Sequence, residues 1–137
     1  MIDARFALEP HICRLAVLNG RREDFDKLEQ LCDQMDRAKN DPIAFAEADS
    51  EYHHTLAMST RNSLLMWLLG HISTMRSLDE WTRMRHLTLD HDIIERYNSQ
   101  HRAILAAVRG REPERAATAM KNHLETARLS LTRVVET

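Results

Sequence analysis

The segment QHRAILAAVRGREPERAATAMKNHL, residues 100–124, holds the clearest turn in the chain and a histidine on either side of it. Gly110 is typical of the residue that ends a helix, and Pro113 suits the first turn of the next one. Apolar residues recur at helical spacing on both sides of this turn. The segment therefore predicts two helices, residues 89–109 and 113–135, that fold back on each other as a hairpin.

The two histidines of this hairpin are expected at the same height. His101 stands about ten residues before the centre of the turn and His123 about eleven after it. With the helical rise per residue, both lie about 15 Å from the turn in an antiparallel pair. Both also fall on the apolar stripe of their helix, so two inward imidazoles at one level require a common partner.

Asp49 and His53 offer that partner. They stand four residues apart in a predicted helix over residues 42–59, so their side chains share one face. Phe45, Tyr52 and Leu56 lie near the same face, which suggests that it turns inward. A buried carboxylate needs a partner, because an isolated charge in a protein core costs several kcal/mol. By itself the pair also fits a plain Asp–His hydrogen bond.

One aspartate and three histidines together make a candidate site for a divalent transition metal ion, with Asp49, His53, His101 and His123 as ligands. Imidazole suits zinc, nickel, copper and iron, and a single carboxylate also admits manganese. We expect zinc, with nickel or manganese as alternatives. Four ligands complete a tetrahedral site, whereas an octahedral ion keeps two positions for water or a substrate. The other five histidines are expected at the surface or in a satisfied core: His11, His54, His71, His86 and His91.

The composition favours an all-α fold. The 137 residues include only three glycines and three prolines, which excludes a turn-rich sandwich or barrel and disfavours a glycine-rich nucleotide binder. Hydrophobic residues make up 43% and charged residues 29%, which excludes wholesale disorder. We expect one domain, residues 1–137, built as a single antiparallel bundle of about six helices around a central metal and ligand site.

Breakers and caps divide the first part of the bundle. Pro10 lies inside the first apolar pattern, so that helix either begins near Glu9 or is kinked at the proline. Asp41 caps the third helix, and Asn62 caps a fourth that continues unevenly to about residue 85. The first three helices are expected over residues 5–19, 23–39 and 42–59.

Charge and cysteine content constrain the partners of the protein and its place in the cell. The chain has 19 basic and 21 acidic residues, which gives no reason to expect nucleic-acid binding by this segment. We find no apolar run long enough for a membrane span and no signal peptide core. Cys13 and Cys32 fit ordinary buried thiols, so a cytoplasmic protein is expected.

The motifs occur in an order that resembles the FCD domain, the helical C-terminal effector-binding domain of the FadR branch of GntR-type bacterial transcription regulators. Tyr52 replaces a usual phenylalanine and Gln100 a usual glutamate, and neither change removes a ligand. The likeness spans about residues 4–134 and fits the shorter, VanR-like form with six helices. The motifs are R-F-A-L-E (5–9), D-S-E-Y-H (49–53), S-T-R-N (59–62), Q-H-R-A-I (100–104) and A-T-A-M-K-N-H-L (117–124).

The resemblance implies a metal held by the four ligands and a small carboxylate effector, such as an organic, hydroxy or sugar acid, that completes the coordination. Arg5 matches the position of the arginine that binds the effector, and the planar fork of a guanidinium fits a carboxylate. Tyr97, one turn from His101, and Arg76 are further candidates for the pocket. These regulators read DNA through an N-terminal winged helix-turn-helix; nothing before Arg5 can form one, so the chain looks like an isolated effector domain, by truncation or by gene structure.

The resemblance also implies a homodimer. The predicted fourth helix has an apolar excess around Leu65, Trp67, Leu68 and Leu69, which fits either a dimer interface or a central position in the bundle. Three functions remain open: a metal-dependent sensor of a small acid, a small metalloenzyme acting on an organic acid, and a structural module cross-linked by metal. We favour the sensor over an enzyme, because Glu51 points away from Asp49 and His53 and the sequence offers no other inward Glu or Asp next to a ligand position to act as a general base.

Overall fold

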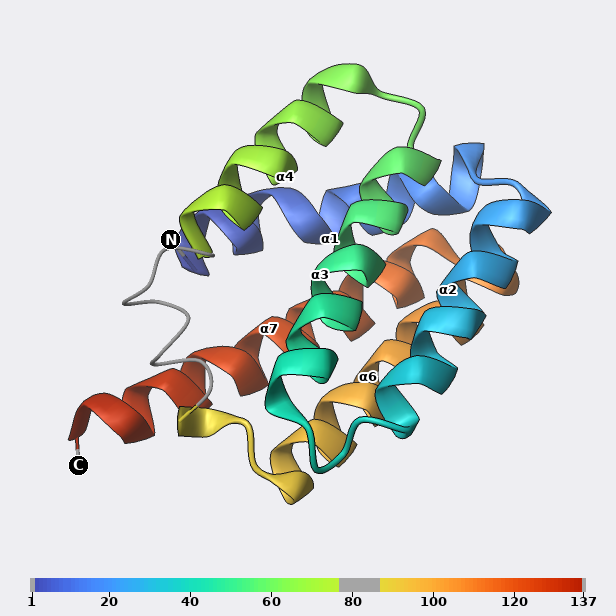
Figure 1. Cartoon of the computed structure of the whole chain (residues 1–137). Helices are drawn as coiled ribbons and strands as arrows, with labels where there is room; N and C mark the ends of the chain where they lie inside the picture. Colours follow the sequence, from blue (N-terminus) through green and yellow to red (C-terminus); the bar gives the residue numbers. More distant parts are fainter. Residues whose placement is uncertain (1, 77–86, 137) are drawn as a thin grey trace.

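The computed structural model describes residues 2–76 and 87–136, and within these ranges it contains six helices and no strand (Figure 1). The all-α prediction is therefore confirmed. The helices are α1 (Ile2–Asn19), α2 (Arg22–Asp36), α3 (Pro42–Ser59), α4 (Ser63–Arg76), α6 (His91–Arg109) and α7 (Pro113–Glu136).

The first helix differs from both of its predicted starts. It begins at Ile2 and runs through Pro10, so the interpretation that it starts near Glu9 is wrong. A proline inside a helix removes one backbone hydrogen bond and crowds the preceding turn. Burial of Pro10, together with its neighbours Glu9 and Ile12, offsets this cost, because packing outweighs local propensity here.

The connection after α2 sets the start of α3. The second helix ends at Asp36 instead of the predicted residue 39, and turns follow up to residue 40. Asp41 then caps α3 as predicted: its Oδ1 accepts a hydrogen bond from the Ala44 N–H at 3.1 Å. The predicted extension of the fourth helix beyond Arg76 lies outside the described residues.

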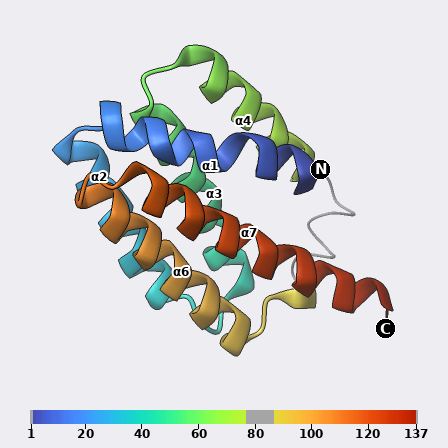
Figure 2. The same cartoon turned by 180° about the vertical axis from the view of Figure 1, so that it is seen from behind.

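The long helices enclose a common core. Seen from behind in Figure 2, α7 lies between α1 and α6, and α3 and α2 cover the other side. The core includes large side chains that are almost fully buried on four helices, each contributing about 1.5–3 kcal/mol of hydrophobic stabilisation. Examples are Ile12, Leu28, Phe45, Leu56 and Ile104. None of the helices in the described ranges is both long and apolar enough to cross a membrane.

The fourth helix stands at the edge of the bundle. It packs mainly on α3 and touches α1, and it runs along the top of the molecule in Figure 1. Trp67 is 59% exposed and Leu64 is 63% exposed. The interpretation of this helix as a central element is therefore wrong.

The α6–α7 turn is tied to the end of α1. Arg111, not Gly110, adopts the left-handed conformation, with φ of 57°, which is unfavourable for a residue with a Cβ. Its guanidinium donates hydrogen bonds to the carbonyls of Val17 at 2.6 Å and Gly20 at 3.1 Å. The same group lies 4.8 Å from the ring centroid of Phe25. These contacts satisfy carbonyls at the end of α1 and hold the hairpin against it.

Both cysteines are free and fully buried, as predicted. Burial raises the pKa of Cys32 to about 12 and raises that of Cys13 further. Both thiols therefore stay protonated and act as small apolar side chains of the core.

We expect Gly20→Ala to destabilise the fold by about 1–3 kcal/mol, because an added Cβ overpacks the site. It would lie 2.4 Å from the Ala16 carbonyl oxygen and 2.6 Å from Cε1 of Phe25. Urea unfolding measures the change. Gly70→Ala in α4 is the control: its Cβ meets nothing within 4 Å, so it should stabilise by about 0.5–1 kcal/mol. Equal effects of the two substitutions would contradict this packing.

Candidate metal centre

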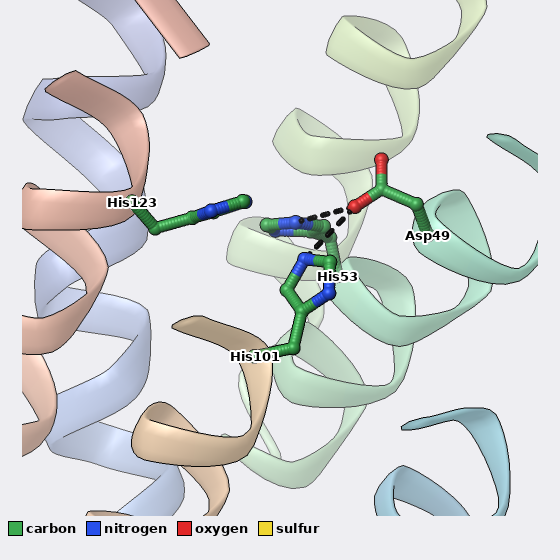
Figure 3. A group of neighbouring side chains, drawn as sticks. All are labelled: Asp49, His53, His101 and His123. Atoms are coloured by element: carbon green, nitrogen blue, oxygen red, sulfur yellow. Dashed lines mark ion pairs between the residues drawn. The ribbon is translucent and has the colours of Figure 1, made fainter. Parts of the chain in front are cut away.

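The structure brings together the four side chains that the sequence singled out. Asp49 and His53 come from α3, His101 from α6 and His123 from α7 (Figure 3). All four are buried, and one potential ligand atom from each lies within 4.8 Å of the others. The rings of His101 and His123 are 4.5 Å apart between centroids, as expected from their equal distance to the hairpin turn.

Asp49 lies at the centre of this group. Its Oδ1 is 3.2 Å from Nε2 of His53 and 3.1 Å from Nε2 of His101 (Figure 3, dashed lines). Among the described residues, Nδ1 of His101 has no hydrogen-bond partner, and the Nε2 atoms of His53 and His101 approach Asp49 without the geometry of a hydrogen bond. Leaving a buried polar atom unsatisfied costs about 1–3 kcal/mol. A cation bound by the carboxylate and by one nitrogen of each ring would satisfy one of these atoms on His53 and one on His101, so the donor set fits a metal ion.

A carboxylate orients the ring of His53 from behind. Glu9 of α1 contacts Nδ1 of His53 through one carboxylate oxygen, and it accepts a hydrogen bond from Nε of Arg5 at 2.5 Å through the other. All three side chains are buried. A histidine that donates one ring N–H to a carboxylate presents the other nitrogen as a ligand atom. Glu9 belongs to the R-F-A-L-E motif, but its contact with His53 joins two helices and is not predictable from spacing within one helix.

His123 has a different partner. Its Nδ1 lies 2.8 Å from Oε1 of Gln100, one residue before His101 on α6. Gln100 is the position where the sequence departs from the usual glutamate of the motif. The substitution therefore falls beside a candidate ligand, where it replaces a charged acceptor with a neutral amide.

The other departure from the motif also has a structural role. The hydroxyl of Tyr52 donates a hydrogen bond to the backbone carbonyl of His101 at 2.7 Å. Its ring lies 4.6 Å from that of His101 between centroids. Tyr52 thereby fixes α6 against α3 at the level of the site, which a phenylalanine cannot do through a hydrogen bond.

The electrostatics of the site follow from burial and from this network. Burial opposes the charge of Glu9, but Arg5 and His53 hold its pKa well below the usual range. Burial lowers the pKa of His101, and burial with the neighbouring histidines lowers that of His123 strongly. For His53, burial acts downward, but Glu9 and Asp49 raise its pKa overall. His101 and His123 are therefore neutral at physiological pH, the form in which imidazole binds a metal.

The predicted effector residues lie in different situations. Arg5 is 6% exposed. Its Nε donates a hydrogen bond to Glu9, and its two terminal nitrogens make no hydrogen bond to any described residue. Tyr97 is buried with its ring 5.3 Å from that of His123 between centroids. Arg76 ends α4, and its side chain lies outside the described part of the structure.

The other described histidines lie away from the centre, as expected. His54 is half-buried, and His86 lies outside the described residues. His91 is close to Asp92 and Glu95, but all three are exposed on the first turns of α6. The exposed histidines are His11, His71 and His91.

Comparisons with known proteins point to one family. A family model described as the FCD domain matches residues 1–126. The Uxu operon transcriptional regulator of Escherichia coli (strain K12) is 29% identical over 134 residues, which cover 96% of this chain and 52% of that protein. The Galactonate operon transcriptional repressor of the same strain is 29% identical over 120 residues, covering 87% of this chain and 51% of that protein. The chain thus spans about half the length of these curated relatives.

Two solved structures superpose on this chain over most of its length. A GntR protein of Streptococcus agalactiae superposes with a TM-score of 0.76 at 27% identity, covering 94% of this chain and 56% of that chain. E. coli McbR/YncC superposes with a TM-score of 0.75 at 16% identity, covering 96% of this chain and 65% of that chain, which shows the same fold.

We expect Arg5→Met to destabilise the metal-free protein by about 3 kcal/mol, because it leaves the buried Glu9 carboxylate without its cation. The contact with His53 keeps the loss at the lower end of the range for broken buried pairs. Arg14→Met, also on α1, is the matched control, since it breaks an exposed pair with Glu114 of α7. Thermal and urea unfolding should separate the two variants; similar stability would show that the Arg5–Glu9 pair is not needed.

Proposed function

Because this chain belongs to the FCD domain family, the effector-binding domains of GntR-family transcription regulators, we propose that residues 1–137 form one sensing domain for a divalent metal ion and a small carboxylate effector. The observation that carries the proposal is the buried group of Asp49, His53, His101 and His123. Its ligand atoms converge, and three of its ring nitrogens have no hydrogen-bond partner among the described residues.

Zinc is our first choice for the metal, with nickel or manganese as alternatives. Three imidazoles and one carboxylate suit each of these ions. When bound, such an ion supplies a positive centre that attracts an anionic oxygen. The protein contributes the orientation: Glu9 and Gln100 hold the rings of His53 and His123, and Tyr52 holds the backbone at His101.

The effector is proposed to be an organic acid, in particular a hydroxy or sugar acid. Arg5 supports this choice, because its Nε binds Glu9 and its terminal nitrogens remain to bind a carboxylate. Tyr97 is a second candidate, because its ring packs edge-on against that of His123. One relative is named for the galactonate operon, and galactonate is a sugar acid with one carboxylate and several hydroxyls.

Effector binding at this place would act on several helices at once. The candidate ligands belong to α3, α6 and α7, and Arg5 with Glu9 belongs to α1. A ligand that contacts all four helices can shift their relative arrangement only by binding one arrangement more tightly. In an intact cytoplasmic regulator, such a shift would alter DNA binding by a winged helix-turn-helix.

The two alternatives are separable from this function. The relatives named above are transcription regulators and not enzymes, which favours the sensor over a metalloenzyme. A structural module would melt on metal removal, yet no small acid would change its melting temperature.

We expect His101→Ala to abolish both tight zinc binding and the rise in melting temperature that zinc and galactonate produce together in the wild-type protein. The reason is that His101 supplies a ligand from the centre of the site, where it is fully buried. Differential scanning fluorimetry with metal analysis measures both effects. His11→Ala, on the exposed side of α1, is the control. A variant that keeps both responses would contradict the site, whereas a zinc response without any acid response, across a panel of hydroxy and sugar acids, would favour the structural module.

We further propose a homodimer formed through α4. Leu64, Trp67 and Met75 are 63%, 59% and 53% exposed and lie on one side of this edge helix. The helix has no Asp, Glu, Lys or Arg before Arg76. In a two-fold interface each patch meets its own copy, so a face without like charges suits self-association.

We expect Trp67→Arg to convert the dimer to a monomer, because it places two cations in the middle of this interface. Light scattering after gel filtration gives the mass. Leu18→Arg, which changes an exposed leucine on α1 (68% exposed), should leave the dimer intact. A Trp67→Arg protein with dimer mass, or a wild-type monomer at micromolar concentration, would contradict the assignment of α4.

A further inference from the structure

The two outer partners of the site differ in a way that affects their chemistry. Glu9, behind His53, is ionised and can only accept hydrogen bonds, so the contacting nitrogen of His53 must donate. Gln100, behind His123, is an amide that accepts through oxygen and donates through nitrogen. An amide fixes the ring of its neighbour only if something fixes the amide.

Thr126 fixes it. The Thr126 hydroxyl donates a hydrogen bond to the backbone carbonyl of Asn122 at 3.1 Å, one turn earlier on α7. Its single proton is thereby used, so its oxygen accepts from Nε2 of Gln100 at 2.8 Å. The amide oxygen of Gln100 then faces His123, and Nδ1 of His123 at 2.8 Å must be the donor.

We propose that Thr126 and Gln100 form a positioning pair that holds His123 in the tautomer with its proton on Nδ1, and so keeps the lone pair of Nε2 for the metal ion. With the amide turned the other way, its NH2 group would face Nδ1, which would have to accept. The proton of His123 would then sit on Nε2, where it blocks a ligand bond. The inference rests on the proposed metal-binding function but concerns a hydrogen-bond network that exists without metal.

The surroundings favour a fixed network over an exchanging one. His123 is 3% exposed and Thr126 is 7% exposed, while Gln100 between them is half-buried, so water has reduced access to these hydrogen bonds. The pair also links α6 to α7 within the hairpin, at the height of His101. Burial makes each unsatisfied atom costly, so the network holds the arrangement in which all its donors and acceptors are paired.

The first test reads the tautomer directly in the metal-free protein. Nitrogen-15 NMR of the histidine rings should show His123 in wild-type protein with its proton on Nδ1. Thr126→Val should produce a mixture of tautomers or shift the proton to Nε2. Thr55→Val is the matched control, because it makes the same substitution at a threonine whose hydroxyl likewise bonds the carbonyl one turn earlier, on α3 and without contacting Gln100. An unchanged His123 spectrum in Thr126→Val would overturn the role of Thr126.

The second test measures zinc affinity by competition with a coloured chelator. Gln100→Met removes the acceptor for His123 and should weaken zinc binding about 10–100-fold, the usual effect of losing an outer partner of a metal-bound histidine. Thr126→Val should weaken it less. Gln100→Glu restores an acceptor and should bind zinc at least as tightly as wild type, with Gln34→Glu on the exposed face of α2 as the control for added charge.

The outcomes separate this inference from the proposed function. Unchanged zinc affinity in Gln100→Met, or a loss in Gln100→Glu as large as in Gln100→Met, would overturn the positioning role while leaving the metal site in place. If wild-type protein binds none of zinc, nickel or manganese, the proposed function fails, and the NMR experiment alone still decides which tautomer the network holds.

Discussion

The buried carboxylate of Asp49 is the constraint on which this structure depends. It is 4% exposed, and one of its oxygens faces His53 of its own helix and His101 of α6. A carboxylate is tolerated at this depth only with partners, because its desolvation otherwise costs several kcal/mol. The helices α3, α6 and α7 must therefore bring their polar groups to one place inside a core that is elsewhere apolar.

The polar centre extends outward in two directions of unlike charge. On one side, His53 is backed by Glu9 and Glu9 by Arg5, so a full ion pair stands behind the ring. On the other side, His123 is backed by the neutral chain of Gln100 and Thr126. The charged side also carries the cation proposed to bind the effector, so an acid that reaches Arg5 would act on the same carboxylate that orients His53. A site with this asymmetry can couple the binding of an anion to the geometry of its ligands.

The sequence was most informative where local rules and tertiary packing agree. The Gly110–Pro113 turn predicted the hairpin and the equal height of His101 and His123, and the structure has both. It was misleading at Pro10, where local propensity favours a helix end but burial of the surrounding turn holds α1 together. The turn geometry also differed in detail, since the left-handed position falls on Arg111, whose hydrogen bonds to α1 lie more than ninety residues back in the chain.

The sequence by itself determined the helical class, most helix limits and the four candidate ligands, because caps, breakers and helical spacing are local features. Only the tertiary structure decided what stands behind those ligands. Glu9 and Gln100 come from helices other than those of the rings they hold, and no spacing rule relates them to His53 and His123. The edge position of α4 could likewise not be predicted from the sequence, since its apolar residues are compatible with a buried helix as well as with an exposed one. Hydrogen bonds and packing between distant segments depend on how the helices are arranged, which periodicity within one helix does not encode.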